Sequence, residues 1–249
     1  MIEVRDLVKQ FPDGTRALSD VNVTIQGGDF VAVIGLSGAG KSTFLRCLNR
    51  LVDPTSGSIV VNGQDVAHLN GAATQKYRRT VGFVFQQFNL VTRLTVIENV
   101  LHGRLGYHGT LRGVLGLYTE EDYQIARDSI RLVGLAEKEN TRVSSLSGGQ
   151  QQRVAIARAM AQRPQLMLAD EPMASLDPRL SDVILGLLRD YNERQGVTVL
   201  INIHVLEHAR RYCKRFLAFN KGRLVADGPI ADLTPELEER VYAGNLETL

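Results

Sequence analysis

The chain has 249 residues, of which 44% are hydrophobic, so one or two domains can bury a substantial core. Its formal net charge of +2 is too small to predict binding to nucleic acid or to an anionic membrane surface. Its two isolated cysteines fit a reducing cytosol, and we expect neither a signal peptide nor a segment of the ~20 apolar residues that span a bilayer.

Apolar patterns predict the strands of the first third of the chain. Residues 2–9 and 18–25 alternate apolar and polar side chains, as half-buried antiparallel strands do. Residues 30–34 and 81–85 are short and wholly apolar, which is typical of strands covered on both faces. Another strand is expected at residues 58–61, before a turn.

The middle of the chain, about residues 87–140, lacks strand-like runs and shows helical patterns instead. Thr119 is a good N-cap for a helix with an acidic first turn. We interpret this stretch as a helical subdomain inserted into an α/β core of residues 1–86 and about 141–249. Within it, residues 102–117 fit either a variable surface loop or a surface that contacts a partner.

Strands and helices alternate after this insertion, which predicts a mainly parallel sheet. Strands are expected at residues 165–169 and 197–203, and a hairpin at residues 216–226. A long helix at residues 179–194 should end at Gly196, a shorter one is expected at residues 205–213, and the tail from residue 233 looks like a short helical end.

A nucleotide-binding motif follows the apolar strand at residues 30–34. The segment GLSGAGKS at residues 35–42 fits G-x-x-x-x-G-K-[ST] and lies between a predicted strand and a predicted helix. In such a loop the backbone N–H groups wrap the β-phosphate, the lysine reaches the β- and γ-oxygens, and the serine hydroxyl can bind Mg²⁺. The residues expected to contact the nucleotide are Gly35, Ser37, Gly38, Ala39, Gly40, Lys41, Ser42 and Thr43.

An acidic pair ends the apolar strand at residues 165–169. Asp170 can hold Mg²⁺, usually through water, and Glu171 is then placed to orient or deprotonate a water that attacks the γ-phosphate. Without the nucleotide-binding loop, the pair would be interpreted as solvated acidic residues at a strand end.

A second helix end suited to an anion is predicted at LSGGQQQR, residues 146–153. Ser147 is a good N-cap, and Gly148 and Gly149 let another group approach the free N–H groups of a helix expected from Gln150 to residue 162. On these residues alone, an ordinary cap with flexible glycines is an equally good interpretation.

One motif points to different chemistry. HVLEH at residues 204–208 fits the zinc-peptidase pattern H-x-x-E-H. His204 ends an apolar strand downstream of a Mg-ATP site, and no third ligand stands out after it. We therefore favour a phosphate-sensing histidine over a zinc ligand.

The order of these motifs resembles the ATP-binding cassette (ABC) ATPases over nearly the whole chain. The resemblance rests on the nucleotide-binding loop, Gln86 after a short strand, LSGGQ, Asp170-Glu171, SLD at residues 175–177 and His204. It implies an α/β P-loop NTPase core with a mainly parallel sheet, an N-terminal antiparallel β subdomain and an inserted α-helical subdomain. It also implies ATP and Mg²⁺ as cofactors.

The resemblance implies a role for each matching position. Phe11 resembles the aromatic that stacks on adenine, although alone it would be interpreted as a core or surface aromatic. Gln86 resembles the glutamine that senses Mg²⁺ and water and links to the membrane partner, with Gln87 as the alternative. Ser147, Gly148, Gly149 and Gln150 would serve the ATP of a second, head-to-tail copy, and Asp177 would contact that copy. The expected catalytic residues are Lys41, Gln86, Glu171 and His204, and the expected Mg²⁺ ligands are Ser42, Gln86 and Asp170.

A closer resemblance, to the ATP-binding subunits of phosphonate importers, rests on LHGRLG at residues 101–106, Leu111-Arg112, LGL at residues 115–117 and EPMASLD at residues 171–177. Met173 departs from the Val, Ile or Thr of many relatives without touching the chemistry. The resemblance implies a homodimer that docks on a transmembrane permease at the cytoplasmic face of the cell membrane. A periplasmic solute-binding protein would be an indirect partner, and no nucleic acid would be bound. The alternatives are an importer for another oxyanion or an amino acid, and a soluble ABC ATPase unrelated to transport.

Overall fold

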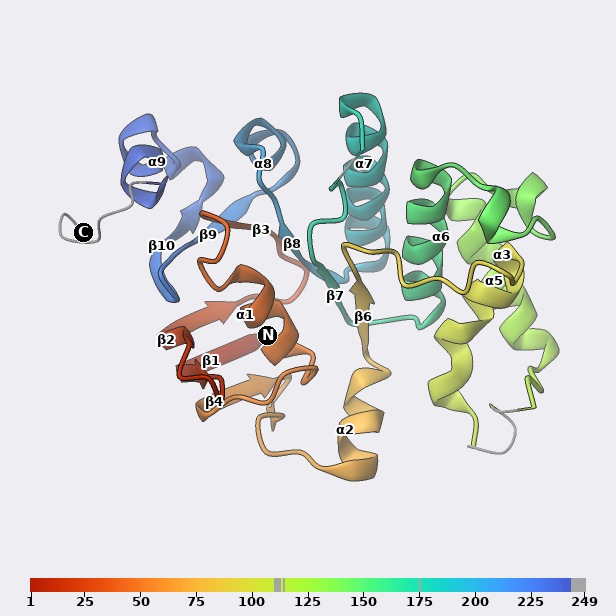
Figure 1. Ribbon diagram of the computed structural model, residues 1–249, viewed down its shortest axis with the longest axis horizontal. Coiled ribbons are helices and arrows are strands. Elements are labelled where there is room, and N and C mark those ends of the chain that lie inside the picture. The colour runs from red at the N-terminus through yellow and green to blue at the C-terminus, as the bar shows by residue number, and fades with distance from the viewer. Residues whose placement is uncertain (110–112, 114, 175, 243–249) are drawn as a thin grey trace.

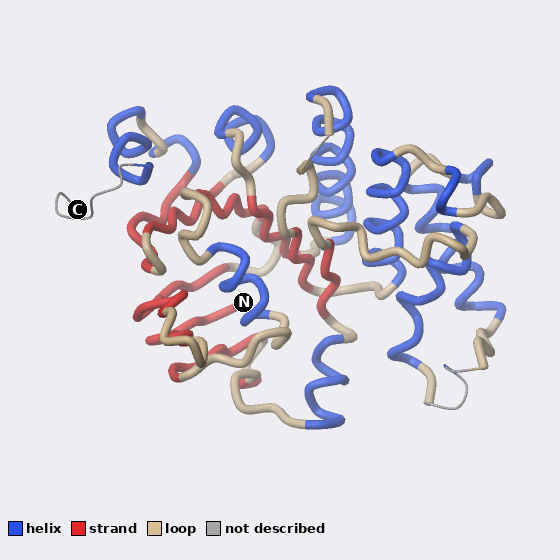
Figure 2. The backbone as a smooth tube through the Cα atoms, viewed as in Figure 1, coloured by secondary structure: helices blue, strands red, loops and turns tan. Residues whose placement is uncertain are grey.

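In the computed structural model, which describes residues 1–109, 113, 115–174 and 176–242, two β-sheets of different kinds lie among helices (Figures 1 and 2). The smaller sheet is antiparallel in the order β2-β1-β4-β5. Its strands are β1 (Ile2–Gln10), β2 (Arg16–Ile25), β4 (Ser56–Val61) and β5 (Gln64–Asp65). This is the N-terminal antiparallel part that the alternating pattern predicts.

The larger sheet has the order β10-β9-β3-β8-β7-β6, and only β10 runs antiparallel to its neighbour. Its strands are β3 (Phe30–Ile34), β6 (Val81–Val84), β7 (Leu166–Ala169), β8 (Thr198–Asn202), β9 (Arg215–Asn220) and β10 (Arg223–Pro229). The predicted α/β class with a mainly parallel sheet is confirmed. Because five strands run parallel, their carboxyl ends meet at one edge, where ligands bind in such sheets.

The parallel strands are buried on both faces, and β3 illustrates why its sequence is continuously apolar. Phe30, Ala32 and Ile34 belong to the core under the helices, whereas Val31 and Val33 belong to the core shared with the antiparallel sheet and α1 (Lys41–Leu48). Alternate residues of a strand point to opposite faces, so both sets have to be apolar.

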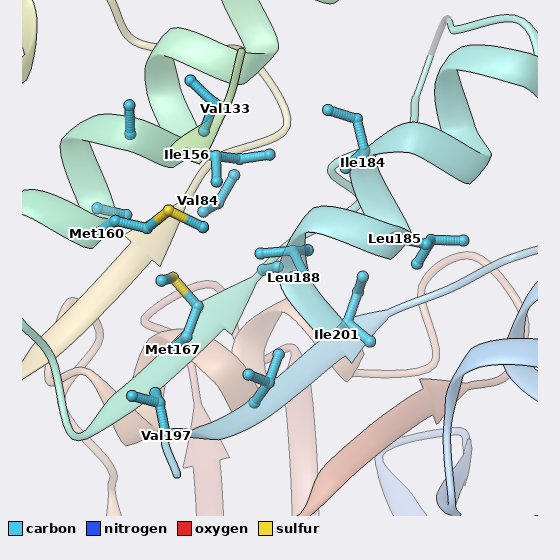
Figure 3. Close-up of a cluster of buried hydrophobic side chains, with 14 of the residues drawn as sticks. Val84, Val133, Ile156, Met160, Met167, Ile184, Leu185, Leu188, Val197 and Ile201 are labelled. Carbon is cyan, nitrogen blue, oxygen red and sulfur yellow. The ribbon is translucent and has the colours of Figure 1, made fainter. Parts of the chain in front are cut away.

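The first of these cores joins the sheet to two long helices. Figure 3 shows Ile156 and Met160 of α6 (Gly148–Ala161) and Leu188 of α7 (Pro178–Gln195) gathered against Met167 and Ile201 of the strands. Each fully buried aliphatic side chain of this kind stabilises the fold by roughly 1.5–3 kcal/mol relative to exposure. The core therefore fixes α6 and α7 relative to the carboxyl edge of the sheet.

The remaining helices complete the layers. They are α2 (Gly71–Arg78), α3 (Val96–Leu101), α5 (Glu120–Leu132), α8 (Leu206–Tyr212), α9 (Pro235–Tyr242) and the short 3₁₀ turns η1 (His102–Tyr107), η2 (Ala136–Lys138), η3 (Val143–Ser145) and η4 (Ile230–Asp232). Figure 1 shows α3, α5 and α6 packed together beyond β6. Helix α6 lies after the expected boundary near residue 141 but packs against α3 and α5 of the helical part. The division into core and helical subdomain stays a prediction. No helix within residues 1–109, 115–174 and 176–242 is long and apolar enough to cross a membrane.

Three helical features differ from the sequence analysis. The helix expected from Gln150 begins at Gly148, because Ser147 and Gln150 form a reciprocal capping box that places both glycines inside the first turn. Helix α3 was not predicted, although Thr95 and Glu98 form the same kind of box. Helix α2 was also missed, since it is short, mostly exposed and has no side-chain cap.

A buried charge cluster anchors the segment that follows α3. Arg104 Nε donates to Asp122 Oδ1 at 2.9 Å, and His108 Nε2 lies 2.8 Å from Asp122 Oδ2. Burial alone would raise the pKa of Asp122, but hydrogen bonds from Arg104, Thr119 and His108 lower it well below its ordinary value. Asp122, only 2% exposed, is therefore a buried anion held by three partners.

Replacing Asp122 by asparagine is expected to lower the free energy of unfolding by about 3 kcal/mol at neutral pH, because buried Arg104 loses its counter-charge. This difference in the free energy of unfolding should have its full size above about pH 4, where aspartate is ionised in the unfolded chain. It should become smaller as the pH falls toward the lowered pKa of Asp122 in the folded protein. Urea denaturation across this pH range measures the difference. Asp128→Asn, whose side chain is 48% exposed, is the matched control and should change stability by less than about 0.5 kcal/mol. A difference that does not vary with pH would contradict the assignment.

Candidate nucleotide and metal site

The loop between β3 and α1 carries the predicted nucleotide-binding motif. Lys41 Nζ donates to the carbonyl oxygens of Gly35 at 2.7 Å and Leu36 at 2.8 Å. Burial lowers the pKa of Lys41, and the negative charges of Glu171 and Asp170 oppose that shift. Carbonyl oxygens of the loop therefore hold the Lys41 ammonium group, which is also close enough to Asp170 and Glu171 to be attracted by their charges.

Two glycines let this loop press against its neighbours. At Gly35 (φ 135°) an added Cβ would lie 2.1 Å from the carbonyl oxygen of Phe219, and at Gly40 (φ 101°) it would lie 2.5 Å from that of Ala17. A Cβ at Gly38 would meet nothing within 4 Å, so this part of the loop faces open space. Strands β9 and β2 thus support the back of the loop and leave its front accessible.

Asp170, at the carboxyl end of β7, lies beside the start of α1. Ser42 Oγ donates to Asp170 Oδ1 at 2.7 Å, and Asn202 Nδ2 donates to the same oxygen at 3.1 Å. Arg46 Nη2 lies 3.3 Å from Asp170 Oδ2. The Asp170 carboxylate is almost fully buried, so these donors replace the water it would have in solution.

The residues around Asp170 fit Mg²⁺. A hydroxyl and a carboxylate supply hard oxygen atoms, and the Oδ1 atom of Asn202 is a buried acceptor without a hydrogen-bond partner. Magnesium is usually held by one or two carboxylates, water and substrate phosphates rather than by an all-protein cage. Among the described residues, no group of three or more His, Cys, Asp and Glu could hold a metal ion.

Glu171 lies between two of the predicted site residues. Gln86 Nε2 donates to Glu171 Oε2 at 2.9 Å, and His204 Nε2 lies 2.7 Å from Glu171 Oε1. Gln86, rather than the alternative Gln87, therefore makes the contact. Glu171 has φ 50°, a left-handed conformation that costs a non-glycine residue about 1–3 kcal/mol and that clusters at functional sites. The turn leaves Asp170 buried and the Glu171 side chain 20% exposed.

The amino end of α6 is exposed and has no described hydrogen bond to the nucleotide-binding loop. Ser147 and Gly148 are exposed, and Gln150 is held by the capping box. Gly149 is buried, and Leu180 packs so closely that a Cβ at this position would lie 2.7 Å from Leu180 Cδ1. Figure 1 shows strands β7 and β6 between α1 and α6. Within one chain, this helix end therefore presents free N–H groups to the surroundings rather than to the loop.

Three further predicted site residues lie in different parts of the structure, and their predicted roles stay predictions. Asp177 is exposed and caps α7 by accepting from the backbone of Leu180, so its described role is a helix cap. Phe11 is half-buried in the turn after β1, with Lys9 Nζ 5.0 Å from its ring centroid. Thr43 lies half-buried in the first turn of α1. Ser175, Leu111 and Arg112 lie outside the described residues.

Two residues that contact Asp170, Asn202 and Arg46, were not predicted from the sequence. A signal existed for Asn202, since it is a polar residue near the end of a largely apolar run, VTVLINI at residues 197–203. A buried polar side chain at the carboxyl end of a parallel strand has to find a partner, and the active edge is where partners are. Arg46 gives no such signal, because an arginine in a helix is usually solvated.

Comparison with known proteins places this geometry in context. The chain matches the family model described as ABC transporter over residues 18–174. It is 46% identical to the phosphonates import ATP-binding protein PhnC of Bacillus anthracis over 242 residues, which cover 97% of this chain and 94% of that protein. It is also 46% identical to PhnC of Staphylococcus haemolyticus over 246 residues, which cover 99% and 96% of the two chains.

Solved structures give the same picture at the level of the fold. The dimeric, post-hydrolysis state of the ATP-binding cassette MJ0796, bound to ADP and Pi, superimposes with a TM-score of 0.81 at 35% identity. The match covers 92% of this chain and 99% of that one. The ADP conformation of the ATP-binding cassette MJ1267 gives a TM-score of 0.83 at 25% identity, with coverage of 96% and 97%.

Proposed function

Because the chain belongs to the ABC transporter family and is an ATPase subunit of that family, we propose that it powers an importer of phosphonates. The observation that carries the substrate is the match to phosphonate importer subunits over 97% of the chain. The site supports the ATPase activity, since Lys41, Asp170 and Glu171 converge at one sheet edge. The predicted partners are a second copy, a transmembrane permease and, indirectly, a periplasmic solute-binding protein, with the subunit bound at the cytoplasmic face of the membrane.

In the proposed reaction, the loop at residues 35–42 binds the phosphates of ATP, and Lys41 exchanges its contacts with loop carbonyls for contacts with phosphate oxygens. Ser42 and Asp170 would hold Mg²⁺, which neutralises charge on the β- and γ-oxygens when it is bound. Glu171 accepts a hydrogen bond from Gln86 and pairs with His204, so its carboxylate is held in one place to orient the attacking water.

The permease contact is proposed at a hollow of about 250 Å³ whose lining residues come from both sides of Gln86 in the chain. Its lining includes Phe83, Phe85, His102 and Arg158, and no Asp or Glu is among the lining residues. Burial, and then the charge of Arg158, lower the pKa of His102. Apolar and cationic side chains in one lining suit a short permease segment that carries an apolar and an acidic side chain.

The proposed function predicts that ATP hydrolysis is controlled by the transported solute. With the permease reconstituted in vesicles, a phosphonate-loaded solute-binding protein should raise the ATPase rate at least about tenfold above the rate with the unloaded protein. The reason is that docking of the loaded protein on the permease should favour the closed, ATP-hydrolysing state of the ATPase dimer. Loading with phosphate, sulfate or an amino acid tests the alternative solutes. Stimulation by one of these and not by a phosphonate would overturn the substrate class. An ATPase rate that is the same with and without the permease would overturn the transport function.

A further inference from the structure

Asn202 ends β8, the strand between β3, which leads into the nucleotide-binding loop, and β7, which leads into the acidic pair. Strand β8 lies between β3 and β7, with Asn202 in register with Val33 and Ile201 in register with Ala169. Asn202 therefore follows the Ile201–Ala169 pair on β8 just as Asp170 follows it on β7. On its other side Asn202 lies beside Val33, near the end of β3, where the nucleotide-binding loop begins. Its side chain is fully buried, at 0% exposure.

The Asn202 amide makes two contacts with predicted metal-site residues. Its Nδ2 atom lies 3.1 Å from Asp170 Oδ1 and 3.4 Å from Ser42 Oγ. The orientation of the amide is fixed by chemistry, because an ionised carboxylate only accepts hydrogen bonds and so must face the NH₂ group. Both oxygens that would bind the metal are thus tied to one rigid donor on a neighbouring strand.

The other end of the same amide has no partner. Asn202 Oδ1 is buried and accepts no hydrogen bond. A buried unsatisfied carbonyl oxygen costs about 1–3 kcal/mol, and most such atoms in folded proteins are paired. The atom belongs to the same amide that donates to Ser42 and Asp170, so the water shell of a cation held by these two residues would supply the missing O–H donor.

We infer that Asn202 is a positioning residue for Mg²⁺: its NH₂ group aims Asp170 and Ser42, and its Oδ1 atom accepts from a metal-bound water. The inference rests on the proposed ATPase function and adds to it a residue that the motifs do not contain. A purely structural role would need only the amide donor, and it would leave Oδ1 unexplained. Removing a residue that hydrogen-bonds to metal ligands typically changes metal affinity by about 10–100-fold.

The first test uses Asn202→Leu, which keeps the approximate volume and removes both hydrogen-bonding groups. ADP affinity is measured by calorimetry with excess Mg²⁺ and again with EDTA, and Mn²⁺ binding to the ADP complex is followed by electron paramagnetic resonance. Mn²⁺ affinity should fall at least about tenfold, whereas ADP affinity in EDTA should change by less than about threefold. Asn192→Leu is the matched control, because Asn192 is a buried amide that donates to Val197 O away from the site. It should leave both affinities unchanged.

A second variant covers the case in which Asn202→Leu does not fold. Asn202→Asp puts a second carboxylate against Asp170, and two buried like charges repel each other. Its melting temperature in EDTA should fall below that of the parent, and Mn²⁺ without nucleotide should recover a large part of that loss. The parent should gain much less from Mn²⁺, because it has one carboxylate fewer. Loss in EDTA without recovery by Mn²⁺ would overturn the inference, as would an unchanged Mn²⁺ affinity in Asn202→Leu.

These outcomes are separable from failure of the proposed function. If the parent protein binds ADP no more tightly with Mg²⁺ than in EDTA, the Mg-ATPase assignment itself is wrong. If the parent shows metal-dependent binding and Asn202→Leu shows the same dependence, only the role of Asn202 is wrong. The solute and the permease do not enter either measurement.

Discussion

Replacement of Glu171 by glutamine is expected to slow multiple-turnover ATP hydrolysis by about 10²–10⁴-fold and to leave ATP binding close to that of the parent. The amide keeps the size of the side chain and can still contact Gln86, but it cannot take a proton from water. Asp170 is buried and already accepts from Ser42 and Asn202, so it is poorly placed to substitute for Glu171.

The measurement is phosphate release at saturating ATP, with ATP affinity determined separately by calorimetry. Glu207→Gln is the matched control, because Glu207 is an exposed carboxylate in α8, three residues after His204. It is also the glutamate of the H-x-x-E-H pattern, so the pair of variants separates the two interpretations of that segment. An inactive Glu207→Gln beside an active Glu171→Gln would reverse the assignment.

The sequence predicts the fold well wherever a single physical constraint acts on consecutive residues. Residues 30–34 are predicted and observed as one strand, because a strand buried on both faces has to be apolar throughout. Thr119 and Gly196 mark helix ends correctly, because capping hydrogen bonds and a left-handed backbone each need particular residues. Helix α2 carries neither a cap nor a clear stripe, so only its tertiary position defines it.

The site is predictable to the extent that one motif determines one function. The nucleotide-binding loop follows from its spacing, the acidic pair follows once that loop is recognised, and their convergence follows from the parallel sheet. The choice of Gln86 over Gln87 does not follow, because it depends on which amide faces Glu171 after the strand ends. Asn202 was missed for a related reason: its importance comes from strand order, which places β8 between the loop strand and the Asp170 strand.

Gly148→Asp is expected to reduce ATP hydrolysis by at least about 10²-fold without destabilising the fold. A Cβ at this position would meet nothing within 4 Å, and an acidic side chain in the first turn of α6 favours the helix. The added carboxylate would repel a γ-phosphate and keep it from the N–H groups of α6. An equivalent loss of one well-placed donor contact in such a site typically costs about 10²–10³-fold in rate. Gly148→Ala is the matched control, since it fills the same space without charge.

The proposed head-to-tail dimer makes Gly148→Asp complementary to Lys41→Ala, because each composite site takes its loop from one copy and its α6 end from the other. In a mixed dimer of the two inactive variants, one site carries both changes and the other carries neither. Mixing the variants should therefore restore hydrolysis and ATP occlusion at one site per mixed dimer, and the rate per subunit should rise with protein concentration until dimers saturate. If each chain instead completed its own site, no mixing ratio could restore either signal, since every chain would carry a defect in its only site. The free helix end at Ser147 and Gly148, which has no described hydrogen bond to its own loop, is what makes recovery the expected result.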